Sequence, residues 1–458
     1  MSNTRRIIAI AWPILIGQLA IISYGVADTM MASRYSATDL AALALGASIY
    51  VSIFLGLSGI LQALTPRIAH LFGAQKFVAI GAEARQGLWL AVFLALIGSS
   101  ILAFPQFLLD LAHASPRLQE KAGLYLRLLA CALPASLCFA VYCALNNALA
   151  KPKMVMLLQV TGLFLKISLN AWFIYGGFGI SAMGGPGCAL ATTIVAWSML
   201  FGAYFLLKHS AQYTAYALFT GWVKPDWSSL RAQLKLGIPL GFAFFIEVTA
   251  FALMAIFIAR LGETMLAAHQ IAANIGAVMY MLPLSIASAT STLVAQALGA
   301  ADIAQAKRIS WHGIRVATLG ASSLGILVWQ MKLPILQLYT NDAGVINRAL
   351  PLFAFLACYQ IFDALQSTIG FVLRAHHIAV FPMLANAFAL WGVGLFGGCV
   401  LGLDLFNLHP PAAISGAMGF WFSNSVSLVA LSIILLVYLV RLQRRLAFSN
   451  SDSARNTD

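Results

Sequence analysis

The chain has 458 residues, of which 61% are hydrophobic and only 9% are charged, and its formal net charge is +13. A soluble globular domain carries about a quarter of its residues as charged side chains, so this composition excludes that class. The basic residues do not form a patch with interleaved aromatics, which argues against nucleic acid as a partner. The apolar segments do not alternate as the strands of a membrane barrel would. We therefore predict an all-α polytopic membrane protein.

Twelve apolar runs are each about 20 residues or longer, enough to cross a hydrocarbon core of roughly 30 Å as a helix. In chain order they lie at 7–32, 40–64, 87–109, 123–149, 154–178, 187–207, 236–260, 265–296, 311–331, 346–373, 378–402 and 412–440. Arg5 and Arg6 precede the first run, which is too long for the apolar region of a signal peptide and is predicted to be an uncleaved span.

Basic residues are distributed unevenly over the loops between these runs. With the N-terminus in the cytoplasm, 19 Lys and Arg residues fall on the cytoplasmic side and seven on the other, and Lys166 remains inside a span. Because Lys and Arg concentrate in cytoplasmic loops, this asymmetry predicts that both termini are cytoplasmic.

An internal repeat appears when the chain is compared with itself at an offset of 226 residues. Pro13 then meets Pro239 and Arg34 meets Arg260, and the match extends ungapped over some 60 residues. The repeat predicts two six-helix lobes. Since six is even, both halves start on the same side of the membrane, and a pseudo-two-fold axis runs along the membrane normal.

The lobe boundaries follow from the longest polar stretch between spans, which carries a Pro-Asp break at its centre. The prediction is an N-terminal lobe at 1–207, a cytoplasmic linker at 208–235, a C-terminal lobe at 236–445 and a polar C-terminal tail at 446–458.

Three carboxylates lie inside the predicted spans: Asp28, Glu247 and Asp363. A charged side chain at the centre of a bilayer costs roughly 2.5–3.5 kcal/mol on insertion scales, so each needs a partner, a cation or a proton. At the repeat offset Glu247 meets Ile21 and Asp28 meets Met254. The acids are thus not symmetric copies, and the two lobes are predicted to have different duties.

Polar residues accompany both acids of the second half. On the tenth span Tyr359, Asp363 and Gln366 belong to one polar stripe that continues to Arg374. On the eighth span Gln270 and Asn274 share a face at i, i+4, next to His269. Hard oxygen ligands of this kind suit sodium, and a carboxylate suits a proton. The alternative is that Asp363 is neutral and joins helices by hydrogen bonds.

Asp28 has a predicted partner in the fifth span, where Lys166 and Asn170 are spaced i, i+4 and point the same way. Pairing Lys166 with Asp28 would lower the cost of burying both charges. The alternative is a lysine whose ammonium reaches toward the interface.

The sequence resembles the multidrug and toxic compound extrusion (MATE) transporters, and within them the NorM-like bacterial branch. The resemblance covers essentially the whole chain and rests on the order of several segments: AWPILIGQ, GVADTMMA, TPRIAHLFGA, ALNNALAKPK, IPLGFAFFIEVTAF and FDALQSTIGFVLRAHHIAVFP. It implies a two-lobe exporter that exchanges sodium or protons for organic, mainly lipophilic cationic compounds by alternating access.

The resemblance also implies roles for single residues. Glu247 and Asp363 match the family's cation-binding carboxylates, Asp28 its N-terminal acid, Asn170 a neighbouring polar position, and Pro13 the proline where the first helix bends.

Two departures stand against this pattern. Lys166 replaces an asparagine, and the motif LRG of the family is Leu373-Arg374-Ala375 in this chain. Both favour coupling through the C-terminal lobe, with an altered N-terminal lobe.

Four alternatives differ in sequence features. A lipid-linked precursor flippase of the same superfamily would need more basic residues inside the spans, and only Lys166 is there. A major facilitator would carry a basic Gly-rich loop after its second helix, an intramembrane enzyme an HExxH or GxSxG motif, and a channel a filter-like repeat, none of which the sequence contains.

We expect the protein to be a monomer in the bacterial inner membrane, in contact with membrane lipids. Its expected substrates are small organic cations. We expect it to bind no nucleic acid and no cofactor besides the coupling ion.

Overall fold

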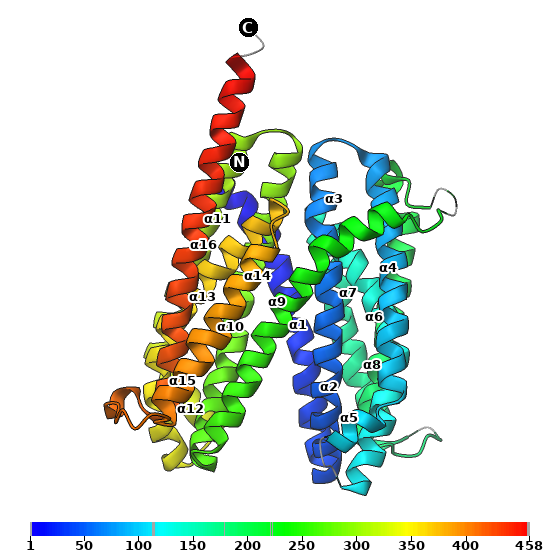
Figure 1. Cartoon of the computed structure of the whole chain (residues 1–458). Coiled ribbons are helices and arrows are strands. Elements are labelled where there is room, and N and C mark those ends of the chain that lie inside the picture. The colour runs from blue at the N-terminus through cyan, green and yellow to red at the C-terminus, as the bar shows by residue number, and fades with distance from the viewer. Residues whose placement is uncertain (1, 112–114, 178, 220, 222, 456–458) are drawn as a thin grey trace. The chain divides into compact units, whose positions relative to one another are not determined.

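The computed structural model describes residues 2–111, 115–177, 179–219, 221 and 223–455, and these are almost entirely helical (Figure 1). Eleven described helices are long and apolar enough to cross a membrane, and the pair α11 and α12, bent by 69° at their junction, makes up to twelve. The predicted class, an all-α polytopic membrane protein, is confirmed.

The helices of the first half follow one another with short breaks. They are α1 Asn3–Tyr35, α2 Ala37–Leu61, α3 Leu64–Gly73, α4 Phe77–Ala103, α5 Gln106–Leu111, α6 Pro116–Ala148, α7 Pro152–Tyr175, α8 Gly185–His209 and the 3₁₀ turn η1 Ala211–Tyr216.

The second half repeats this plan with one helix divided. Its elements are α9 Trp227–Ala259, α10 Glu263–Gly299, α11 Ile303–Gln330, α12 Lys332–Tyr339, α13 Ala343–Ala375, α14 Val380–Ala387, the π-helix η2 Phe388–Phe396, α15 Gly397–Gly402, the 3₁₀ turn η3 Ala412–Ile414 and α16 Gly416–Arg455. The predicted tail therefore continues the last helix as far as Arg455, and residues 456–458 lie outside the described residues.

Packing divides the chain into two compact units. The N-terminal unit is Ile16–Gly241, in which α6 packs against α2, α4 and α8; the C-terminal unit is Met1–Leu15 with Phe242–Asp458, in which α13 packs against α10, α11 and α16. The chain passes between units inside α1 and α9, in each case two residues after a proline, Pro13 or Pro239. The lobe and linker limits expected from the sequence stay predictions.

The internal repeat is visible in the helix bounds. Adding 226 to the range 77–103 of α4 gives 303–329, and α11 occupies Ile303–Gln330; adding 227 to the range 116–148 of α6 gives 343–375, which is the range of α13. The two halves of the sequence thus specify the same series of helices.

Backbone turns repeat with the helices. Four of the non-glycine residues with positive φ form two matched pairs after helix ends: Gln75 (57°) with Ala301 (59°), and Ala150 (55°) with His377 (59°). At each of the four, the amide of the following residue donates to the carbonyl five positions back, which closes a Schellman motif. Glycine is the usual residue there, so both halves hold a side chain in the left-handed region.

The segment after α8 is fastened to the N-terminal unit. Tyr213 Oη donates to Asn146 Oδ1 (2.6 Å), and Trp89 Nε1 donates to the carbonyl oxygen of Val223 (3.0 Å). Lys151 Nζ donates to the carbonyl oxygen of Gln212 (3.2 Å), and burial lowers the pKa of this lysine. The predicted linker region is therefore folded onto α4, α6 and the start of α7.

The C-terminal counterpart of α7 is built differently. Positions 166 and 170 of α7 correspond at the offset of 227 to Val393 and Gly397, which lie in and directly after the π-helix η2. A π-helix bonds i to i+5 and leaves wider turns. Ser423 Oγ of α16 donates to the carbonyl oxygen of Val393 (2.8 Å).

Candidate functional site

A buried polar cluster in the N-terminal unit joins α1, α7 and α8. Gly187 lets α7 and α8 approach closely, because a Cβ at this position would lie 2.8 Å from the carbonyl oxygen of Phe173. Small residues at such crossings allow membrane helices to bring their backbones together. The approach sets the carbonyl of Cys188 beside Lys166.

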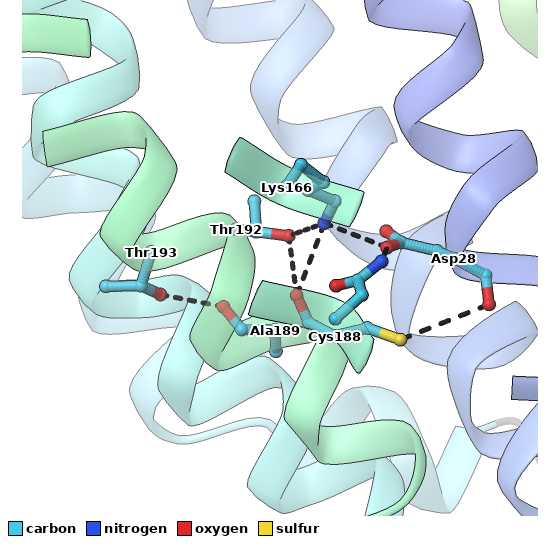
Figure 2. Close-up of polar contacts among 7 residues, drawn as sticks. Asp28, Lys166, Cys188, Ala189, Thr192 and Thr193 are labelled. Atoms are coloured by element: carbon cyan, nitrogen blue, oxygen red, sulfur yellow. Dashed lines mark hydrogen bonds and ion pairs between the residues drawn. The ribbon is translucent and has the colours of Figure 1, made fainter. Parts of the chain in front are cut away.

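The cluster contains the predicted ion pair. Lys166 Nζ lies 2.9 Å from Asp28 Oδ1, and both residues are buried, with 1% and 8% of their surface exposed. Figure 2 shows that the ammonium also points to Thr192 Oγ1 and to the carbonyl oxygen of Cys188, the latter at 3.3 Å. Lys166 therefore pairs with Asp28 inside the helix bundle and does not reach toward an interface.

Asn170 completes the surroundings of Asp28. Its Nδ2 donates to Asp28 Oδ1 at 2.6 Å, so this carboxylate oxygen accepts from both Asn170 and Lys166. The other side-chain atom, Asn170 Oδ1, is buried and has no hydrogen-bond partner. The i, i+4 spacing read from the sequence thus brings both polar groups of α7 to one acid.

The C-terminal unit holds the other two acids. Glu247 lies on α9 and Asp363 on α13, and the two carboxylates are close enough for their charges to interact. Gln366 Nε2 donates to Asp363 Oδ1 at 3.0 Å. Among the described residues, Glu247 accepts no hydrogen bond and has no cationic nitrogen within 4.0 Å, although it is only partly exposed. Two carboxyl groups therefore lie near each other with few hydrogen-bond donors.

Aromatic side chains frame these acids. The ring of Tyr359 packs edge-on against Trp421 (centroids 5.8 Å apart) and Phe251 (6.2 Å), and Trp421 Nε1 donates to His269 Nδ1 at 3.2 Å. Tyr359 also lies within electrostatic range of Asp363. Tyr359 is thus held by packing against two aromatic rings, one of which is fixed by His269.

Arg374 is the cation nearest to this cluster. Its guanidinium lies 4.1 Å from the ring centroid of Phe371 and 5.2 Å from that of Phe244. It interacts electrostatically with Glu247 from beyond ion-pair distance, and its Nη1 is buried without a hydrogen-bond partner. Arg374 is held by aromatic stacking and leaves the carboxylate of Glu247 open.

The remaining candidates lie apart from the acids. Gln270 and Asn274 are exposed on α10 and bond to each other (3.4 Å), as their spacing predicted, but neither bonds to Glu247 or Asp363 among the described residues. Pro13 is buried inside α1 without ending the helix.

Several residues of the two clusters carry no signal that the sequence reading used. Cys188 contributes its backbone carbonyl to Lys166 and its thiol to the carbonyl oxygen of Asp28 (4.0 Å). Thr192 of α8, and Tyr280 of α10, which lies within electrostatic range of Glu247 and Asp363, are ordinary residues of apolar helices in the sequence. Arg374 was assigned to the cytoplasmic end of its span by the count of basic loop residues. The polar stripe of the tenth span also includes Arg374, at i+11 from Asp363, and the structure places Arg374 in the last turn of α13.

Neither cluster has the ligands of a transition-metal site. Within the described residues no three His, Cys, Asp or Glu side chains are grouped to hold a metal ion. The oxygen-rich donors present suit a monovalent cation or a proton.

Comparison with known proteins agrees with this geometry. The MatE family model matches the chain twice, at residues 13–172 and 239–400, which reproduces the internal repeat. The chain is 38% identical to a probable multidrug resistance protein NorM of Aromatoleum aromaticum (93% of this chain, 91% of the relative) and 35% identical to the multidrug resistance protein PmpM of Pseudomonas aeruginosa (97% and 92%).

Solved structures share the fold. The eukaryotic MATE transporter AtDTX14 has a TM-score of 0.83 at 18% identity over 97% of this chain and 98% of its own, and an outward-facing multidrug resistance MATE transporter has a TM-score of 0.88 at 17% identity over 98% and 97%. With the family model covering more than half of its length and relatives above 30% identity, the chain belongs to the MATE family and is a multi-pass membrane transporter, not an enzyme.

Proposed function

We propose that this transporter is a cation-coupled antiporter, driven by sodium or protons, that exports organic and mainly lipophilic cationic compounds. Relatives at 30–38% identity bear names of multidrug resistance proteins. One observation carries the coupling proposal: Glu247 accepts no hydrogen bond among the described residues and is close enough to Asp363 for their charges to interact, whereas Asp28 is compensated by Lys166.

The mechanism follows from the electrostatics of the C-terminal unit. Two neighbouring carboxylates inside membrane helices repel each other and are poorly solvated, so a bound sodium ion or proton lowers their free energy. Entry of that ion from outside stabilises the C-terminal unit in a closed arrangement. A drug cation and the coupling ion then compete, directly or through conformation, and the ion gradient drives alternating access.

The chemistry of the two polar clusters favours cationic substrates over lipid phosphates. Lys166 is the basic residue at the middle of a span, and its ammonium is already bonded to Asp28, Thr192 and Cys188. It is therefore not available to bind a phosphate, as a lipid-linked precursor flippase would require. The ring of Tyr359, which lies within electrostatic range of both acids of the C-terminal unit, suits a cation-π contact.

The proposal includes the setting of the protein. We place it in the bacterial inner membrane as a monomer surrounded by lipids, with both termini in the cytoplasm, because basic residues concentrate on that side. Apart from the coupling ion it needs no cofactor.

The test uses purified full-length protein in proteoliposomes loaded with a fluorescent cationic dye. An imposed sodium gradient and an imposed pH gradient are applied separately, and dye movement is followed against protein-free vesicles. We expect one of the two gradients to drive dye uphill. Dye movement under neither gradient would contradict the proposal and favour the flippase.

A further inference from the structure

The ammonium group of Lys166 has a complete set of hydrogen-bond acceptors. An ammonium carries three N–H donors. Lys166 Nζ contacts three acceptors: Asp28 Oδ1 at 2.9 Å, the carbonyl oxygen of Cys188 at 3.3 Å, and Thr192 Oγ1 (Figure 2). Thr192 in turn donates its own hydroxyl proton to the carbonyl of Cys188, at 2.8 Å. No donor of the lysine is left over.

The same acceptors form an oxygen cage of the kind that binds a small cation. It combines a carboxylate oxygen, a backbone carbonyl and a hydroxyl, and hard cations are bound through such oxygens. Rings of protein oxygens replace the hydration shell of alkali ions in channels. Asn170 Oδ1, which is buried in a fully buried side chain and has no partner, supplies a further oxygen next to Asp28.

The cage is closed to large ligands. Lys166 is 1% exposed and Asn170 is fully buried, so an organic drug cannot reach the carboxylate of Asp28 on this side without displacing the lysine. We propose that Lys166 is a tethered cation: its ammonium fills an oxygen site that would otherwise take a small monovalent cation, and it thereby withdraws Asp28 from ion exchange.

Lys166 thus determines whether the N-terminal unit binds a free cation. With Lys166 in place, this unit binds no free cation. Shortening the lysine uncovers a site for sodium, potassium or ammonium on α1, α7 and α8. That ion coupling then depends on Glu247 and Asp363 alone rests on the proposed function. That Lys166 occupies a cation site does not.

The experiment measures cation binding in a background in which both C-terminal acids have been neutralised by substitution. The full chain carrying Glu247→Gln and Asp363→Asn is compared with and without Lys166→Ala in detergent. Thermal unfolding is followed in N-methylglucamine chloride and in NaCl, KCl or NH₄Cl at equal ionic strength. We expect no cation dependence with Lys166 present. With Lys166→Ala we expect the melting temperature to rise by about 2–4 °C in at least one of these salts at a concentration far above its dissociation constant.

Two further measurements locate the effect. Asp28→Asn added to the alanine variant should abolish the shift, because it removes the charged ligand. Propylammonium chloride, which replaces the part of the lysine beyond Cβ, should also stabilise the alanine variant and leave the parent unchanged.

The outcomes are decisive in both directions. If the alanine variant does not fold, Lys166→Asn is measured in the same way. An alanine or asparagine variant that is as indifferent to cations as its parent overturns the tethered-cation proposal, as does failure of both variants to fold in every salt. Because the background already lacks both C-terminal acids, a failure of dye export in proteoliposomes cannot be confused with either result.

Discussion

The two units place carboxylates in membrane helices in opposite ways. In the N-terminal unit Asp28 is bonded to Lys166 and Asn170. In the C-terminal unit Glu247 and Asp363 lie near each other, and only Gln366 donates to either of them among the described residues. A charge that is compensated within the chain stabilises the fold, and a charge left open has to be compensated from outside. Under the proposed function, Asp28 has a structural role, whereas Glu247 and Asp363 exchange the coupling ion.

The largest expected effect comes from neutralising the open acids. Glu247→Gln and Asp363→Asn should each lower gradient-driven dye export about 100-fold or more, to the level of protein-free vesicles, because the coupling ion loses a charged ligand. Efflux from loaded proteoliposomes at matched protein density measures this.

Glu263→Gln is the matched control for those variants. Glu263 is an exposed carboxylate in the first turn of α10, and its removal should leave export unchanged. Wild-type export from either Glu247→Gln or Asp363→Asn would remove the basis for assigning coupling to the C-terminal unit.

Breaking the closed pair should instead affect folding. Asp28→Asn or Lys166→Met each leaves a buried charge without its partner, and we expect each to lower the free energy of unfolding by about 3–5 kcal/mol. The double variant leaves no charge behind and should lose much less. Denaturant or thermal unfolding in detergent measures the stability of the wild type, the two single variants and the double variant, which together form a double-mutant cycle.

The same measurement on Glu247→Gln sharpens the contrast. Since that carboxylate has no donor to lose, its neutral form should unfold at the same temperature as the wild type or higher. Equal destabilisation by Asp28→Asn and Glu247→Gln would mean that the two units do not differ in the way described.

Arg374 offers a smaller, graded change. Its guanidinium partly compensates Glu247 from beyond 4 Å, so Arg374→Gln should lower the half-maximal concentration of the driving cation about tenfold, or roughly 1.4 kcal/mol. The concentration dependence of dye export measures it. Arg374→Lys keeps the charge and loses the stacking on Phe371, so an equal shift in both variants would point to stacking and not to charge.

The smallest effect concerns features that the units share. Ala150 and Ala301 hold positive φ in matched types of turn, and replacing either with glycine should raise the free energy of unfolding by about 0.5–1 kcal/mol. Melting temperatures would show gains of similar size in the two halves. Ala144→Gly, inside α6, should have the opposite sign. A loss at both turns would contradict the assignment of strain to these positions.

Much of the fold could be predicted from the sequence. The length of the apolar runs indicates the membrane spans, and the internal repeat, which includes the matched prolines, indicates the two halves. The bounds were less so: the third apolar run was expected at 87–109, whereas α4 begins at Phe77 and ends at Ala103. The first turns of α4 contain the buried residues Glu83 and Gln86. The hydroxyl of Ser229 donates to Glu83, and the backbone amide of Asp226 donates to Gln86. A prediction from hydropathy therefore misses these turns, because their polar residues are buried through hydrogen bonds that only the folded chain contains.

The sites were predictable where charge complements charge. Asp28 and Lys166 could be matched because each needed a partner inside a span. The cage around Lys166 could not be foreseen, since a backbone carbonyl such as that of Cys188 has no sequence signature. Arg374 lies in the last turn of α13, at the end of the span where the sequence places it, but its stacking on Phe371 and Phe244 has no sequence signature.

The π-helix η2 has a consequence for how the two halves have diverged. A π turn holds about one residue more than an α turn, so Phe388–Phe396 can absorb an added or deleted residue by changing its winding. The helix continues into α15 without turning every later side chain to another face. We therefore expect the segment that corresponds to Lys166 and Asn170 in the second half to accept an inserted residue without a change in the rest of the helix.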